Sequence, residues 1–356
     1  MKRRIFVLGA GFSAAYGYPT VEKLFEKIME KAPEEKSKEI LPLLSEYYPH
    51  FDEKYKNYPN IEEFLGFLQI DKEMSISTGR ESSSPLFPQK PIYDHDRKKI
   101  EKIEKILTVL ISEYFFEQLN QPLPSHLKNF CENLKEGDVI ISFNWDLLVE
   151  KCLDEIGKKY SYFPWGDPSD RNTKILILKP HGSINWIIAD SKEEIEKFFK
   201  KEEFEDFGDG RTFGFKNFEY RKEQEDFIHC IIPPIPYKKF TFPLKQKEEK
   251  VCEKVPGHLE VIWRKIWLTL SEETEKIYFI GYSFPKYDLH IRYIFRKTLG
   301  IRICKEEKND PNSVKVINPD FLVYANYVYI FGKNFIFINS KFENINIKED
   351  LFNQNE

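Results

Sequence analysis

The sequence contains no long hydrophobic run and no large excess of either charge. No stretch approaches the roughly 20 apolar residues that a membrane-spanning helix needs, so we expect no membrane association. The 54 Lys and Arg nearly balance the 58 Asp and Glu, giving a net charge of −4. Such a chain has no global basic field to attract nucleic acid. The basic start, Met1–Arg4, precedes an apolar run of only about five residues, too short for a secretory leader, which favours a cytoplasmic protein.

Closely spaced cysteine pairs are also missing. The five cysteines are scattered along the chain, and no two have the CxxC spacing of a zinc knuckle: Cys131, Cys152, Cys230, Cys252 and Cys304. We therefore expect no metal site. An odd, scattered set of this kind is typical of reduced core cysteines in the cytoplasm.

Short apolar runs that alternate with helical patterns predict the fold class. Buried parallel strands read as mainly apolar runs, and six such runs are present. They are Ile5–Leu8, Val139–Phe143, Ile175–Leu178, Cys230–Ile232, Ile277–Ile280 and Val314–Ile317. Helical spacing of apolar residues lies between most of them. This alternation predicts an α/β fold, a Rossmann-like, doubly wound and mainly parallel sheet within one domain over 1–356.

The long interval between the first two predicted strands indicates an insertion. A single crossover helix does not need the chain between Leu8 and Val139. We expect a helical subdomain over 20–137, with residues 71–96 forming a long loop because they carry Ser, Pro and charge without periodicity. The charged, Phe-rich residues 190–228 predict a surface insertion.

Residues 321–356 are expected to form a C-terminal extension. They contain two apolar runs, Phe321–Phe331 and Phe335–Ile338, which fit either a hairpin or a helix followed by a strand. The same region is a candidate interface for self-assembly, although ordinary core is the alternative that apolar runs more often form.

A glycine-rich turn follows the first predicted strand directly. In the run Gly9-Ala10-Gly11-Phe12-Ser13, the glycines let the backbone turn sharply and approach a pyrophosphate. Ala14 occupies the third glycine position of the dinucleotide fingerprint, a tolerated variant. The alternative is a turn with a purely structural role.

The second predicted strand ends in Phe143-Asn144-Trp145-Asp146. Polar residues at the carboxyl end of a buried strand lie where α/β sheets bind ligands. Asn144 and Asp146 are therefore candidate site residues. In the structural alternative, Asn144 only ends the strand and Asp146 caps the following helix.

The third predicted strand ends in Lys179-Pro180-His181-Gly182-Ser183. A histidine there faces the ligand crevice and suits proton transfer near neutral pH. The alternative for His181 is a hydrogen-bonded core histidine. None of the other six histidines has a comparable position.

Two later strands end in further polar turns. One is followed by Gly281-Tyr282-Ser283-Phe284-Pro285 and then Tyr287-Asp288, and the other ends in Asn318. Gly281, Ser283 and Asn318 are candidate ligand contacts. As structural alternatives, Gly281 is only a turn and Asn318 only terminates a strand before Pro319.

These five motifs, taken in order, resemble those of sirtuins. The run from Gly9 to Pro19 has the GxGxSxxxGxP pattern of the sirtuin cofactor loop, Asn144 and Asp146 match a Gln-Asn-Ile-Asp segment, and His181 matches a catalytic His-Gly. The Gly281-Tyr282-Ser283 turn with Tyr287-Asp288 after it resembles the Gly-Tyr-Ser-x-x-Asp form of bacterial defence proteins of this family. The sequence departs from sirtuins at Phe143, which replaces Gln, and after Pro19, where the Phe-Arg-Gly step is missing.

The resemblance implies a sirtuin-like fold without the zinc module, and an NAD hydrolase of antiviral defence. NAD would be the substrate, with no metal. His181 would be the general base and Asn144 would orient the ribose or a water. Gly9, Ala10, Gly11, Phe12, Ser13, Asp146, Gly281, Ser283 and Asn318 would contact NAD.

Two other functions remain open: an NAD or ADP-ribose sensor without turnover, and a protein deacylase. Because the cysteine pairs of the zinc module found in deacylating sirtuins are absent, water is favoured over an acetyl oxygen as the nucleophile. Cyclisation of NAD remains open beside hydrolysis. The family further implies a homo-oligomer or a regulatory partner, such as a DNA-translocating ATPase or an Argonaute. The basic run Arg97-Lys98-Lys99 fits a solvated helix face better than direct contact with nucleic acid.

Overall fold

The computed structural model describes residues 3–78, 97–164, 173–207, 211–215, 220–233, 258–285, 288–300 and 313–352. In these ranges no helix is long and apolar enough to cross a membrane.

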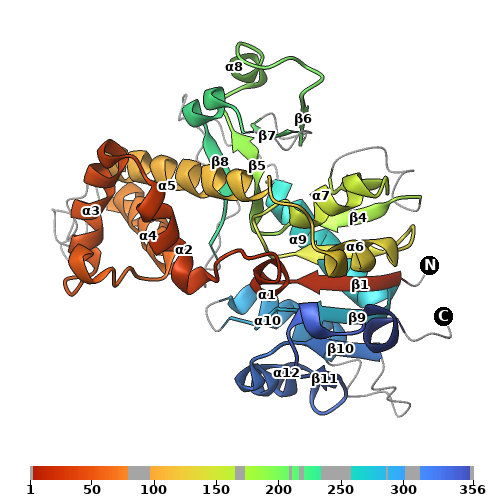
Figure 1. Cartoon of the computed structure of the whole chain (residues 1–356). Coiled ribbons are helices and arrows are strands. Elements are labelled where there is room, and N and C mark those ends of the chain that lie inside the picture. Colours follow the sequence, from red (N-terminus) through yellow and green to blue (C-terminus); the bar gives the residue numbers. More distant parts are fainter. Residues whose placement is uncertain are drawn as a thin grey trace.

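A seven-stranded parallel sheet forms the centre of the protein (Figure 1). Its order is β11-β10-β9-β1-β2-β4-β3. The strands are β1 (Arg3–Leu8), β2 (Val139–Ser142), β3 (Tyr160–Tyr162), β4 (Ile175–Leu178), β9 (Thr274–Ile280), β10 (Val314–Ile317) and β11 (Ile336–Ile338). The chain first forms β1, β2 and the edge strand β3, then inserts β4 between β2 and β3, and finally returns to add β9, β10 and β11 on the other side of β1. This confirms the predicted α/β fold of Rossmann-like type.

Both faces of the sheet are covered, as the alternation of side chains along β9 shows. Tyr278 stacks on Phe6 of β1 on one face. Its neighbour Phe279 points to the opposite face and contacts Phe295 of α10 (Leu289–Phe295) and Phe331 of α12 (Tyr324–Phe331). Successive residues of a strand face opposite sides, so runs without polar positions arise when both sides are buried.

Most of the chain between β1 and β2 is helical. The helices are α1 (Ala10–Ala14), α2 (Val21–Lys31), α3 (Glu34–Tyr47), α4 (Ile61–Thr78), α5 (Arg97–Gln118) and α6 (Ser125–Glu132). Figure 1 shows α2 to α5 grouped beyond the end of the sheet at which β1 stops, with α6 beside β1. Phe130 of α6 packs edge-on against Phe6, so α6 covers the sheet itself.

The predicted loop over 71–96 is wrong at its start, because α4 continues to Thr78. Polar side chains of this last part of α4 bond to neighbouring helices. Asp71 accepts a hydrogen bond from Tyr47 of α3, and Lys72 pairs with Glu104 of α5 at 2.5 Å. Residues 79–96 lie outside the described residues.

A second, antiparallel sheet follows β4. It consists of β5 (Gly182–Ile188), β6 (Phe204–Asp206), β7 (Thr212–Phe215) and β8 (Ile228–Ile231), in the order β6-β7-β5-β8. The strand predicted at Cys230–Ile232 belongs here and not to the parallel sheet. The reason is local: β5 starts directly after the His181 turn, and the amide of Ile232 donates to the carbonyl of His181 at 2.9 Å.

Helices α7 (Leu148–Glu155) and α9 (His258–Leu268) complete the main layers, and α8 (Lys192–Ile195) belongs to the second-sheet region. The C-terminal apolar runs form helix α12 and then strand β11, so the helix–strand alternative is the one observed. Tyr327 and Phe331 are buried in the core, whereas Phe321 and Leu322 are exposed.

Candidate functional site

The carboxyl ends of five adjacent strands bring the candidate residues to one edge of the sheet. In spatial order, β10, β9, β1, β2 and β4 are neighbours and run parallel. They are followed by Asn318, Gly281, the Gly9–Ser13 turn, Asn144 and His181 respectively. This is the edge that faces the group of helices α2 to α5 in Figure 1. The topology thus places all five motifs at one end of the sheet.

The glycine turns after β1 and β9 touch each other backbone to backbone. The Gly11 amide donates to the Gly281 carbonyl at 3.0 Å. A Cβ on Gly281, which has φ +61°, would lie 2.4 Å from Gly11 Cα, and a Cβ on Gly9 would lie 2.7 Å from the Cα of Tyr282. The close contact between the two turns therefore requires glycine at positions 9 and 281, whether or not a ligand binds there.

Asn144, Ser13 and Asp146 form a continuous hydrogen-bonded group. The Asn144 side-chain amide donates to the Gly9 carbonyl and to Ser13 Oγ, both at 2.9 Å. Ser13 Oγ donates to Asp146 Oδ2 at 2.6 Å, and Asp146 Oδ1 accepts the Leu148 amide at the start of α7 at 3.0 Å. The group fastens the end of β2 to the turn after β1.

The orientation of the Asn144 amide leaves an acceptor available. A backbone carbonyl only accepts, so the nitrogen of Asn144 must face Gly9 and the oxygen must point away. Among the described residues, no donor reaches Asn144 Oδ1, and the residue is only partly buried. Asn144 can therefore accept a hydrogen bond from a hydroxyl or a water at this edge.

Both carboxylate oxygens of Asp146 accept hydrogen bonds from protein groups, and the side chain is buried. Burial raises the pKa of Asp146, while the charge of Lys179 and the bond from Ser13 act in the opposite direction. Its bond to Leu148 corresponds to the helix-start role considered as the structural alternative. Asp146 therefore supports Ser13 in this structure.

Beneath this group lies a buried ion pair that connects β4 to α7. Lys179 Nζ donates to the Asp146 carbonyl at 2.5 Å and to Glu150 Oε1 at 3.1 Å. The side chains of Lys179 and Glu150 are both 0% exposed, and the Tyr162 hydroxyl also donates to Glu150. A buried pair with these extra bonds fixes the positions of Asp146 and the end of β4.

His181 is paired with the carboxylate of Asp288, which directly precedes α10. His181 Nε2 lies 2.9 Å from Asp288 Oδ2, and the two residues are 4% and 0% exposed. Asp288 is the residue before α10, and its Oδ1 accepts the Ile291 amide. An imidazole held by a carboxylate has the arrangement of a general base.

Aromatic rings surround this histidine. The ring centroid of Phe143 lies 5.2 Å from that of His181, and the same Phe143 ring stacks on Tyr282 with the centroids 4.6 Å apart. Trp263 of α9 lies 6.3 Å from the His181 ring. Burial first, and the charge of Asp288 second, raises the pKa of Tyr282. The histidine and its carboxylate are thus in surroundings of low polarity.

The other candidate residues take separate positions. The Phe12 ring packs in the core against Phe130 and Phe342, while Ala10 and Ser283 are exposed. Asn318 is buried, donates to the Tyr282 carbonyl at 3.2 Å and accepts the Asp320 amide at 2.9 Å. The side chains of Phe12 and Asn318 therefore already have protein partners.

Sequence reasoning left out two members of this edge, Asp288 and Lys179. Asp288 carried a signal, because it follows the Gly281-Tyr282-Ser283 turn and precedes a helix, but its partner is 107 positions away. Lys179 adjoins the His181 motif and ends an apolar run, where a buried charge indicates a paired ion.

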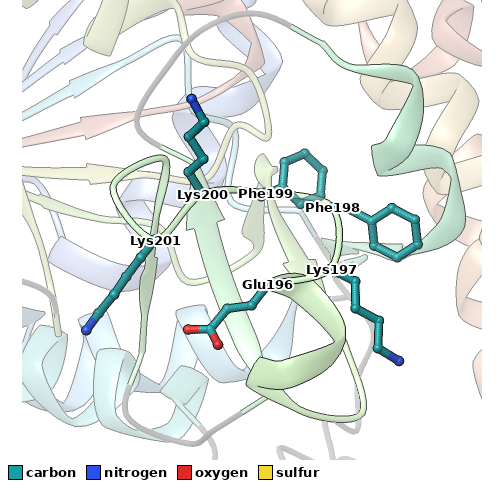
Figure 2. A pocket seen from close by; sticks show the side chains of 6 residues that line it. All are labelled: Glu196, Lys197, Phe198, Phe199, Lys200 and Lys201. Carbon is teal, nitrogen blue, oxygen red and sulfur yellow. The ribbon is translucent and has the colours of Figure 1, made fainter.

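A hollow of about 470 Å³ elsewhere on the surface is formed by residues 196–201, near the second sheet. Figure 2 shows that the charged ends of its side chains point away from one another, so no polar groups converge there. Within the described ranges, no three His, Cys, Asp or Glu side chains gather to hold a metal ion.

No family model matches the chain, and no curated protein matches it. The residues at the carboxyl edge of the sheet are therefore the features that indicate a function.

Proposed function

We propose that this protein binds NAD at the carboxyl edge of its parallel sheet and hydrolyses the nicotinamide–ribose bond. The observation that carries the proposal is the convergence of an amide with an open acceptor, Asn144, and a carboxylate-paired histidine, His181, beside the glycine turn after β1. In parallel α/β folds this edge is where nucleotides bind.

The reaction needs a group that holds the ribose and a group that takes a proton. Nicotinamide leaves as a neutral molecule, and water forms the new bond to the ribose carbon and loses a proton. Asn144 Oδ1 accepts a hydrogen bond from a ribose hydroxyl or the attacking water without adding charge. His181 takes the proton of the water, which a neutral imidazole does well near pH 7.

The aromatic surroundings contribute by limiting water. The rings of Phe143 and Trp263 lie beside His181, and Tyr282 stacks on Phe143, which keeps the local dielectric low. In such a site a hydrogen bond to a developing charge is worth more than in water. Limited water also bears on the product, because cyclisation competes with hydrolysis when water is scarce.

A sensor that binds NAD or ADP-ribose without turnover is the second candidate. The observation that favours it is the burial of His181, which is only 4% exposed, together with the use of the Gly11 amide by the Gly281 carbonyl. Binding would then require no proton transfer. The Asn144 acceptor serves both candidates equally, so turnover separates them.

The biological role that we propose is depletion of NAD in antiviral defence. A chain with this activity needs control, which self-assembly or a partner protein of the ATPase or Argonaute kind would supply. The exposed Phe321 and Leu322 lie in the segment that was considered as an interface.

The test is incubation of the purified protein with NAD, with free nicotinamide followed by chromatography and NAD binding measured by calorimetry. Release by the wild-type protein and none by His181→Ala supports the hydrolase. Binding without release by the wild-type protein supports the sensor. Absence of both binding and release contradicts the NAD assignment.

A further inference from the structure

Asp288 contacts two groups from different parts of the chain. Its Oδ2 lies 2.9 Å from His181 Nε2, at the end of β4, and its Oδ1 accepts the Ile291 amide of α10 at 3.2 Å. The side chain is fully buried. Because each oxygen has its own partner, the carboxylate cannot rotate without losing a hydrogen bond.

The bond to Asp288 decides which ring nitrogen of His181 carries the proton. An ionised carboxylate only accepts hydrogen bonds, so Nε2 must be the donor. In the neutral ring the lone pair then lies on Nδ1. We propose that Asp288 is a positioning residue that fixes this tautomer, so that Nδ1 of His181 is the atom that takes the proton from water. The catalytic half of this proposal rests on the proposed function.

The ring has further restraints that agree with such a role. The ring centroids of Phe143 and Trp263 lie 5.2 Å and 6.3 Å from that of His181, so both rings limit its tilt. The bond to Asp288 limits rotation within the ring plane. A general base benefits from a fixed ring orientation because proton transfer requires a defined distance and direction.

The substitution Asp288→Asn separates the tautomer from the fold. The Ile291 amide still needs an acceptor, so the oxygen of the new side chain keeps the position of Oδ1. Asparagine is also a good residue before a helix. Its NH₂ group then faces His181 and donates to Nε2. The ring is forced into the opposite tautomer, with the proton on Nδ1, and the base is lost.

The experiment combines a spectrum with a rate. Long-range ¹H–¹⁵N correlation spectra at a pH where the ring is neutral show which nitrogen is protonated, with His181→Phe used to assign the signal. Nicotinamide release and NAD affinity are measured on the same proteins. The matched control is Asp52→Asn, because Asp52 accepts the Lys54 amide before a short helix on the exposed surface.

We expect Nε2–H in the wild-type protein and Nδ1–H in Asp288→Asn. We also expect nicotinamide release to fall by at least about 100-fold with unchanged NAD affinity, the usual size of a general-base contribution. Asp52→Asn should match the wild-type protein in both readouts. The same tautomer in both proteins, or an unchanged rate with a reversed tautomer, overturns the proposal. The spectrum needs no NAD, so a wild-type protein that releases no nicotinamide contradicts the proposed function while the spectrum still decides the role of Asp288.

Discussion

The side-chain amide of Asn144 donates to the carbonyl oxygen of Gly9 at 2.9 Å and so links the end of β2 to the turn after β1. The same amide donates to Ser13, whose hydroxyl donates to the buried Asp146. One asparagine thereby fixes the turn after β1 and keeps its side-chain oxygen available as an acceptor. The proposed function therefore assigns this residue a part in both stability and ligand binding.

Ser13→Ala should destabilise the protein by about 1–3 kcal/mol, because Asp146 Oδ2 then stays buried without its donor. The free energy of unfolding in urea measures this. The matched control is Ser45→Ala, since the exposed Ser45 hydroxyl only donates to the Leu41 carbonyl one turn earlier. That change should stay within about 0.5 kcal/mol. Equal effects of the two substitutions would show that the Ser13 group is not a stabilising network.

The contact between the two glycine turns predicts a second difference. Gly281→Ala places a Cβ 2.4 Å from the backbone of Gly11, whereas Gly157 has a similar φ of +71° and nothing within 4 Å of its Cβ. Both alanines bear the cost of a left-handed backbone, roughly 1–2 kcal/mol. Only Gly281→Ala adds a backbone clash, so its loss of stability should exceed that of Gly157→Ala by about 2 kcal/mol or more. Similar losses would mean that the turns separate easily.

Sequence patterns predicted five of the seven strands of the parallel sheet, β1, β2, β4, β9 and β10, because these runs are buried on both faces. They did not predict β3, which is only three residues long and half-buried at two of them. They were insufficient for β8, because an equally apolar run pairs with β5, which starts directly after the His181 turn. The start of the predicted loop also failed, since Asp71 and Lys72 are polar yet bonded to neighbouring helices.

The sequence predicted which residues follow the strands at the candidate site, but it did not predict the side chains that bond to them. Parallel order places Asn144 and His181 at one edge once their strands are recognised. The partner of His181 was not predictable from spacing, because Asp288 reaches it only through the packing of α10. From the sequence alone, the glycines fit either ligand binding or a turn with a structural role. The structure shows that Gly9 and Gly281 are needed for the contact between the two turns.

The buried pair of Lys179 and Glu150 predicts a large effect of removing one charge. Lys179→Met should cost about 3–5 kcal/mol of unfolding free energy, because Glu150 is then left buried with an unpaired charge. Adding Glu150→Gln should recover part of the loss. The exposed pair of Lys38 and Glu34 is the control, and Lys38→Met should cost no more than about 1 kcal/mol. No recovery in the double variant would mean that charge is not the cause.

His229 of β8 predicts a pH dependence of stability. Burial lowers the pKa of His229 to about 4, and its Nδ1 donates to the Ile184 carbonyl. The unfolded chain takes up the proton at about pH 6.5, so the folded state is favoured above that pH and loses stability as the pH falls toward 4. The loss should approach about 3 kcal/mol. Urea titrations from pH 7 to pH 4 measure it.

His229→Asn should flatten this dependence, because the side chain that titrates is gone while a donor toward Ile184 remains. The constant loss from the smaller side chain does not affect the slope. Substitution of the exposed His50 by Gln should leave the dependence unchanged. A slope that survives His229→Asn would assign the pH dependence to other groups.

The most direct test of the central claim is the rate of nicotinamide release from NAD by the wild-type protein, Asn144→Ala and Asn57→Ala. Asn57 makes a similar pair of side-chain bonds, to the His50 carbonyl and the Asp52 amide, on the exposed part of the helical group. We predict release by the wild-type protein and by Asn57→Ala, and at least about 100-fold slower release by Asn144→Ala, since ribose positioning supplies a large part of the rate. An Asn144→Ala protein that is folded and as active as the wild type would contradict the account.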